Sequence, residues 1–376
     1  MNDIRLYADG IHDDTAAIQA MLDRRGTVEL GCGSYLISRP LIIHDDTHFR
    51  LSAAATLRLK DGANCSLLDN DGLYEHRVNR NITIEGGIWD GRGKYQTRES
   101  IPDENVPFDF EKYLSNSLLV LMIRLVHTEN LTVKNVTFKD PTSFAIQIAD
   151  VKYFTVENVF FDFDLSKPNM DGIHIQGPAR FGRISNVRGD ANDDHVALCA
   201  NGTTRSEITR GDIEDIDIDG IYCENGYTGV RLLSRGDAVR NIRISNVHGA
   251  FRFYAVSFTH HYPLREDMPV LLENIRVSNV FASKSTGKIP VDWHRSGVMT
   301  QSLIWFEQGI TCRNVTVENL CRNERNVETV APTIRIDENV SAENLTFINL
   351  NQRFPGKPLP LIENKGNVPY TLTNES

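Results

Sequence analysis

The stretch Asn81-Ile82-Thr83-Ile84-Glu85-Gly86 alternates apolar and polar residues between an asparagine and a glycine. Close copies of it begin at Asn130, Asn241, Asn274, Asn314 and Asn344, and degenerate copies begin at Tyr153, Phe181 and Asp215. The alternation has the period of two that is typical of a β-strand with one buried face. Asparagine tolerates the left-handed backbone region, and its amide can stack on neighbouring amides, so it suits the corner of a strand.

The repeat predicts an all-β fold, a single-stranded right-handed parallel β-helix. Its copies recur at intervals of roughly 30 residues, and short strands at such a period bury a continuous core when they stack as coils. A β-sandwich is the alternative, but it would show hairpin turns of Asn-Gly type, and these are scarce here. We expect one domain over residues 1–376, with an N-terminal cap (1–26), coils (27–366) and a C-terminal tail (367–376).

The predicted cap contains an amphipathic helix over residues 13–23. Asp13 or Asp14 can cap its N-terminus, because a carboxylate accepts hydrogen bonds from the first backbone N–H groups. Ile18, Met21 and Leu22 share one apolar face, which we expect to cover the open end of the first coil.

Charge and composition narrow the classes of partner. The chain of 376 residues has a formal net charge of −10, which argues against nucleic-acid binding. No run approaches the roughly 20 apolar residues of a membrane span, so no membrane partner is expected. Residues 1–5 show no signal peptide, which favours a cytoplasmic location, or a secreted one if a leader was removed. The six cysteines show no metal-ligand spacing, and no metal site is predicted.

A second family of strands lies between the asparagine copies, at 144–148, 172–175, 195–198, 229–232 and 255–258. Their apolar residues are expected to stack inward, which leaves two columns facing solvent. The first column is mostly small: Ala145, Gly172, His195, Gly229 and Ala255. The second is more polar: Gln147, His174, Ala197, Arg231 and Ser257. With strands about 4.8 Å apart, a flat sugar ring could lie on this face; the alternative is an ordinary solvated sheet face.

Acidic residues stand directly before two of these strands, in Asn169-Met170-Asp171-Gly172 and Asn192-Asp193-Asp194-His195. The two segments are about one coil apart, so three carboxylates are expected at one edge. Like charges this close raise at least one pKa, and a protonated carboxyl beside an ionised one is what glycoside hydrolysis requires. Strict alternation turns Asp171 and Asp194 inward, unless the chain still bends there, as Gly172 allows. A calcium or turn-capping site is the alternative.

These motifs resemble glycoside hydrolase family 28, the polygalacturonase-like enzymes with a pectin-lyase-like β-helix. The similar segments cover nearly the whole chain: residues 86–93, 168–172, 192–198, 229–233 and 254–262. The resemblance implies that Asp193 is the general acid and that Asp171 and Asp194 hold the nucleophilic water. It also implies inverting hydrolysis of a carbohydrate substrate without metal or cofactor.

Further residues are candidate substrate contacts: Arg231 and Tyr262 by the resemblance, with Asn169, Gln147, His174, His195, His260 and His261. The chain lacks the family's Gly-His-Gly segment and has Leu233 in place of a lysine. That change removes a charge-assisted contact to an acidic sugar, so a neutral or differently charged glycan is as good a candidate as polygalacturonan.

Two other functions remain open at this stage. In a polysaccharide lyase, the three aspartates would bind Ca²⁺ and Arg231 would abstract a proton. In a non-catalytic β-helix, the same face would only bind glycan, since fold does not determine function. Two insertions, 94–116 and 283–301, carry aromatic residues that could shape the groove or simply cover the side of the helix.

Overall fold

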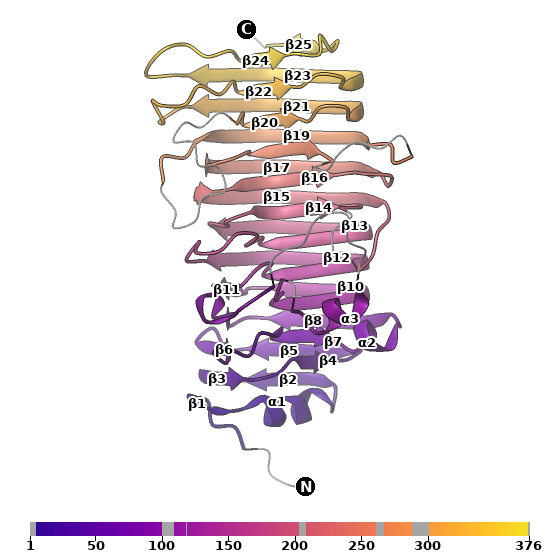
Figure 1. Ribbon diagram of the computed structural model, residues 1–376, viewed down its shortest axis with the longest axis vertical. Helices are drawn as coiled ribbons and strands as arrows, with labels where there is room; N and C mark the ends of the chain where they lie inside the picture. Colours follow the sequence, from indigo (N-terminus) through magenta and orange to yellow (C-terminus); the bar gives the residue numbers. More distant parts are fainter. Residues whose placement is uncertain are drawn as a thin grey trace.

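The computed structural model describes residues 5–99, 109–117, 119–202, 208–260, 267–287 and 301–374. Its strands form one sheet that winds into coils, and these stack in chain order along the long axis (Figure 1). Within the described residues, neighbouring coils pair in parallel throughout, as β15 does with β17 and β17 with β19. The all-β parallel β-helix predicted from the asparagine repeat is confirmed.

The N-terminal coils contain β1 (Asp9–Asp13), β2 (Gly26–Leu30), β3 (Gly33–Ile37), β4 (Leu41–Ile43), β5 (Thr47–Leu51), β6 (Ala55–Leu59), β7 (Leu68–Asn70), β8 (Asn79–Glu85) and β9 (Ile88–Asp90). The central coils contain β10 (Ile123–Lys134), β11 (Thr137–Lys139), β12 (Ile146–Asp162), β13 (Ile173–Gly189), β14 (Asp194–Cys199), β15 (Ile213–Gly226), β16 (Thr228–Leu233), β17 (Val239–Phe251) and β18 (Val256–Thr259). The C-terminal coils contain β19 (Leu271–Lys284), β20 (Ile304–Phe306), β21 (Thr311–Asn323), β22 (Ile334–Ile336), β23 (Ser341–Arg353), β24 (Ile362–Asn364) and β25 (Thr371–Thr373). The helical segments are α1 (Thr15–Leu22), α2 (Gly72–Glu75), η1 (Gly93–Tyr95) and α3 (Phe110–Leu114).

Helix α1 lies at the N-terminal end of the coil stack (Figure 1). Ile18 and Leu22 are fully buried against the first coils, and Met21 is partly buried. Asp13 accepts the backbone N–H of Thr15, whereas the carboxylate of Asp14 turns away from the helix and accepts two N–H groups of the preceding segment.

Asparagine ladders run along the corners of the coils. The side-chain amide of Asn274 donates to Asn241 at 3.0 Å, and Asn314 in turn donates to Asn274 at 2.9 Å. Asn344 continues the ladder by donating to Asn314. All four residues adopt positive φ angles, between 52° and 57°. The asparagines therefore close each corner and tie it to the corner of the neighbouring coil.

Both columns of the second strand family depart from the prediction that they face solvent. In the more polar column, Gln147, His174, Ala197 and Ser257 are buried, and only Arg231 is partly exposed. The mostly small column lies inside. Ala145 and Ala255 lie in the apolar core, and a Cβ on Gly172 would lie 2.1 Å from the ring of Phe161. The expectation that this column faces solvent is wrong. The chain bends at residues 145, 172 and 255, directly before the strands begin, so the alternation of the strands does not extend to these positions.

Candidate active site

The three predicted carboxylates come together at the start of two adjacent coils. The N–H of Gly172 donates to the carbonyl of Asp194 at 2.8 Å, and Ile173 pairs with Val196. Asp171 and Asp194 therefore occupy the same position on neighbouring rungs, about 4.8 Å apart along the axis of the β-helix. Asp193 precedes Asp194 by one residue. The bend that turns Gly172 toward the interior also keeps the side chains of Asp171 and Asp194 from pointing inward.

The cluster is shielded from solvent. Asp171 and Asp194 are each 1% exposed, whereas Asp193 is 8% exposed. Arg231 reaches across from β16, and its Nη2 lies 2.6 Å from Oδ2 of Asp194. His174 Nδ1 lies 2.9 Å from Oδ2 of Asp171, whose Oδ1 makes no hydrogen bond to any described residue. A buried, partly unsatisfied carboxyl is costly to folding, which is typical of a site kept for chemistry.

Burial and mutual repulsion set the protonation of these groups. Burial raises the pKa of Asp171 and of Asp194 well above their usual range, and the neighbouring carboxylate of Asp193 raises both further. Burial also raises the pKa of Asp193, while the guanidinium of Arg231 works in the opposite direction on all three. The guanidinium of Arg231, which pairs directly with Asp194, is the largest effect that opposes burial there and favours the ionised form of Asp194.

Three predicted substrate contacts lie at this cluster. Arg231 pairs with Asp194, and His174 joins Asp171 while its ring stacks on Phe144 at 4.2 Å between centroids. Asn169 lies beside them, with a left-handed backbone conformation (φ 56°) and its Oδ1 3.5 Å from Nη2 of Arg98.

Gln147 is not open to solvent. It is fully buried, because the hydroxyl of Tyr113 in α3 donates to its Oε1 and its Nε2 donates to Gln176. The insertion that carries α3 folds over this part of the sheet, so the expected groove does not extend there.

The remaining predicted contacts do not join the carboxylates. His195 is buried and faces the interior between the rings of Phe161 and Phe251, which corrects the expectation that it faces the groove. His260 directly follows β18, at the opposite end of that strand from the carboxylates. The separation is about six residues, or about 20 Å of extended strand. The backbone N–H of His260 donates to Glu307, and its Nε2 lies 2.9 Å from the carbonyl oxygen of Gln308. His261 and Tyr262 lie outside the described residues, as do residues 288–300 of the second insertion.

Three residues near the carboxylates were not predicted from the sequence: Arg98, Tyr227 and Arg252. Arg98 interacts electrostatically with Asp193, and its buried Nη1 makes no hydrogen bond to a described residue. Arg252 acts on Asp193 as well, and Tyr227 on both Asp193 and Asp194. They come from loops and from other coils, and no repeat or motif in the sequence marks them.

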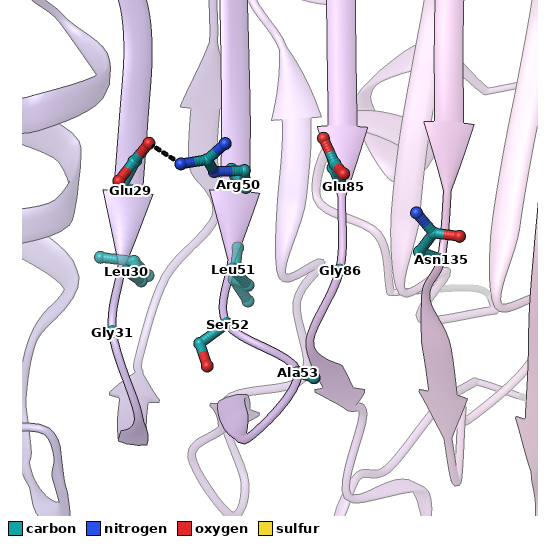
Figure 2. Close-up of a pocket in the computed structure, with 10 residues that line it drawn as sticks. All are labelled: Glu29, Leu30, Gly31, Arg50, Leu51, Ser52, Ala53, Glu85, Gly86 and Asn135. Carbon is teal, nitrogen blue, oxygen red and sulfur yellow. Dashed lines mark hydrogen bonds and ion pairs between the residues drawn. The ribbon is translucent and has the colours of Figure 1, made fainter.

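A separate hollow lies on the N-terminal coils (Figure 2). It is lined by residues at and beyond the ends of β2, β5 and β8, together with Asn135. The guanidinium of Arg50 forms an ion pair with Glu29 at its edge (Figure 2). None of the predicted site residues lines it, so this hollow is not part of the carboxylate cluster.

The fold and the cluster define a parallel β-helix that carries a buried acidic site suited to acid–base chemistry. The model of the glycosyl hydrolases family 28 matches residues 44–358, and the chain belongs to this family. The family expectation drawn from the motifs is thereby confirmed.

Two solved structures show the same fold at low identity. The surface adhesin PfbA of Streptococcus pneumoniae superposes with a TM-score of 0.61 and 20% identity, covering 99% of this chain and 88% of that chain. A family 28 exopolygalacturonase of Yersinia enterocolitica gives a TM-score of 0.55 and 15% identity, covering 99% of this chain and 76% of the other.

A curated relative is similar over a shorter stretch. It is the plasmin and fibronectin-binding protein A of Streptococcus pneumoniae (strain ATCC BAA-255 / R6), 32% identical over 191 residues. The match covers 46% of this chain and 25% of the relative, so the chain corresponds to only part of that protein. Within the described residues, no helix has the length and apolar character to cross a membrane.

Proposed function

We propose that this protein is a glycoside hydrolase that cleaves an O-glycosidic bond of an oligosaccharide or polysaccharide, with inversion. The observation that carries the proposal is the convergence of Asp171, Asp193 and Asp194 on adjacent rungs beside one arginine. Membership of family 28 supports the same class of reaction. Hydrolysis of this kind needs one carboxyl that gives a proton and another that takes one.

Asp193 is the proposed general acid. It is the most exposed of the three, and its raised pKa favours the protonated form that donates to the leaving oxygen. Asp194, whose ionised form is stabilised by the guanidinium of Arg231, accepts a proton from the attacking water, and Asp171 helps to position that water. The water oxygen then forms the new bond to the anomeric carbon as the glycosidic bond breaks. Asn169, His174 and Arg231 are the proposed substrate contacts.

The proposal is tested by a screen of plant and bacterial glycans with detection of new reducing ends. The wild-type protein and Asp193→Asn are assayed side by side. Loss of the acid should lower turnover by roughly 10²-fold or more on any glycan that is cleaved. Near-native turnover by Asp193→Asn would contradict the assignment of Asp193.

A second function, binding of glycan without hydrolysis, is favoured by one observation. The curated relative bears the name of a plasmin and fibronectin-binding protein, and a similar solved structure is described as a surface adhesin. For a binding protein, the same screen would yield retention on a glycan array with no product, and Asp193→Asn would leave that retention unchanged.

A calcium-dependent lyase is less well supported. Arg231 would have to act as its base, but the buried carboxylates around it raise its pKa further, and its guanidinium already pairs with Asp194. That positive charge also opposes a Ca²⁺ ion held by the same aspartates. An unsaturated, ultraviolet-absorbing product that disappears with a chelator would overturn this reasoning.

A further inference from the structure

The column of positions that holds two of the aspartates turns apolar on the neighbouring rungs. The backbone hydrogen bonds that place Asp171 beside Asp194 recur on the next two rungs toward the N-terminus. There, the same position is held first by Phe144 and then by Leu121. Phe144 is 6% exposed and Leu121 is 1% exposed. The row of acidic side chains therefore ends directly at a buried apolar surface.

Phe144 and Leu121 belong to a small hydrophobic cluster on the outer face of the sheet, which we call the N-terminal wall. Its buried members come from α2 and α3, from the segments before β10 and β12, and from those two strands: Leu73, Tyr113, Leu119, Leu121, Val126, Phe144 and Ala149. Helix α2 lies beside β7 and β10 (Figure 1). The outer face of β10 and β12, along which a groove would continue, is thus the floor of a second core.

Buried polar contacts hold the N-terminal wall on the sheet. Arg124 of β10 and Asp69 of β7 form an ion pair at 2.6 Å, and neither side chain is exposed. The guanidinium of Arg124 also donates to the backbone carbonyls of Tyr113 and Leu114 in α3. Moving α3 away would leave buried donors of this guanidinium without partners, which is costly. The wall is therefore a fixed part of the fold.

The N-terminal wall begins close to the proposed reaction centre. The ring of Phe144 stacks on the ring of His174, with centroids 4.2 Å apart, and Nδ1 of His174 lies 2.9 Å from Oδ2 of Asp171. Phe144 and Asp171 are on adjacent rungs, and a sugar unit of a glycan spans about 5 Å, close to the rung spacing of about 4.8 Å. Room for about one sugar unit remains between the carboxylates and the wall.

The outer face differs in the opposite direction. Toward the C-terminal coils, the outward side chains on successive rungs are Arg231, Ser257 and Trp305. Arg231 and Trp305 are partly exposed, and the small Ser257 lies buried between them. The ring of Trp305 stacks on Tyr254, and its Nε1 donates to Asp337 at 2.8 Å, so its orientation is fixed. The face that remains for the rest of a glycan therefore lies over the C-terminal coils.

We propose that this protein removes single sugar units from one end of its glycan, and that the N-terminal wall determines this selectivity. The inference rests on the proposed hydrolysis at Asp171, Asp193 and Asp194. A glycan that lies along the coils meets the wall about one sugar unit beyond the bond that is cleaved. A bond in the middle of a long chain cannot reach Asp193, because the chain would have to continue through the wall.

Product analysis on the full-length protein tests the proposal. The probe is the glycan that is cleaved in the screen, used as the polymer and as a hexasaccharide with a fluorophore at its reducing end. We expect a monosaccharide as the only small product from the first time points. The viscosity of the polymer should fall slowly relative to the number of new reducing ends. The labelled hexasaccharide should shorten by one unit at a time, or resist cleavage while the unlabelled one is cleaved if the label blocks the attacked end.

Two variants of the N-terminal wall test its role. Phe144→Ala removes the side chain one rung from Asp171 and should add a disaccharide to the products. Val126→Ala is the matched control, because Val126 is fully buried in the same wall but lies two rungs from Asp171. It should release the monosaccharide alone. The ratio of products does not depend on total activity, so a general loss of stability would not imitate the effect.

The possible failures are distinguishable. Fragments of two or more units released by the wild type at early time points would overturn this inference and leave the proposed hydrolase intact. No cleavage of any glycan in the screen would overturn the hydrolase and this inference with it. A product pattern in Phe144→Ala equal to that of the wild type would overturn the role of the wall. The wild-type pattern remains decisive if Phe144→Ala fails to fold.

Discussion

Replacing Arg231 by glutamine should destabilise the protein strongly and in a pH-dependent manner. Its guanidinium is the direct ion-pair partner of Asp194, which is 1% exposed, and it also acts on Asp171 and Asp193. Removing one partner of a buried ion pair leaves an uncompensated charge and typically costs about 3–5 kcal/mol. We expect a loss in this range at neutral pH, measured by urea unfolding followed by circular dichroism.

The dependence on pH follows from the raised pKa values of Asp171 and Asp194. A carboxyl with a higher pKa in the folded state binds more protons there than in the unfolded chain, so stability falls as pH rises above about 4. Arg231 opposes this effect, so Arg231→Gln should raise both pKa values further. Its cost should be greatest at neutral pH and should shrink towards acid pH, where the carboxyls are protonated in both proteins.

Arg243→Gln is the matched control for this prediction. Arg243 also forms a two-pronged ion pair, with Asp217, but the two side chains are 72% and 45% exposed. An exposed ion pair contributes at most about 1 kcal/mol, because solvent screens the two charges. Equal losses in the two variants, or a cost for Arg231→Gln that does not shrink in acid, would refute the electrostatic reasoning.

Two further predictions concern the asparagine ladder and the buried carboxyl. Asn274→Ala should lower the free energy of unfolding by about 2–3 kcal/mol. It places alanine at φ 53° and removes the side-chain hydrogen bonds to Asn241 and Asn314. Asn274→Gly should recover the backbone part of that loss in the same urea assay, and equal losses would show that backbone strain plays no part. Asp171→Asn should raise the free energy of unfolding at pH 8 by about 1 kcal/mol or more, since it removes a buried carboxyl that resists ionisation. A variant less stable than the wild type at pH 8 would contradict the raised pKa of Asp171.

The fold could be predicted from the sequence because the coils repeat one local pattern, a corner asparagine followed by alternating apolar and polar residues. Asn241, Asn274 and Asn314 recur with the same alternation behind them, and each stacks on the previous one in the structure. The neighbourhood of Asp171, Asp193 and Asp194 could be predicted for a similar reason, since their separation matches one coil.

The inward position of His195 could not be predicted from the alternation of the strands. The chain bends as it enters the second strand family, and one residue of bend exchanges the inner and outer sides. The burial of Gln147 depends on how an insertion folds back to bring Tyr113 over the sheet. Arg98 comes from a segment far from the three aspartates in the chain, and no motif marks it.

The most direct test of the central claim is the steady-state turnover of Asp193→Asn, compared with Asp217→Asn, on a glycan that the wild type cleaves. Asp217 lies on the outer sheet face and pairs only with Arg243 in the contacts of the described chain. Removing a group that acts only in the transition state should lower kcat and leave KM unchanged. We predict a fall in kcat of about 10²-fold or more for Asp193→Asn and wild-type kinetics for Asp217→Asn. Wild-type kcat in Asp193→Asn, or the same loss in both variants, would contradict a hydrolytic site built on these three carboxyls.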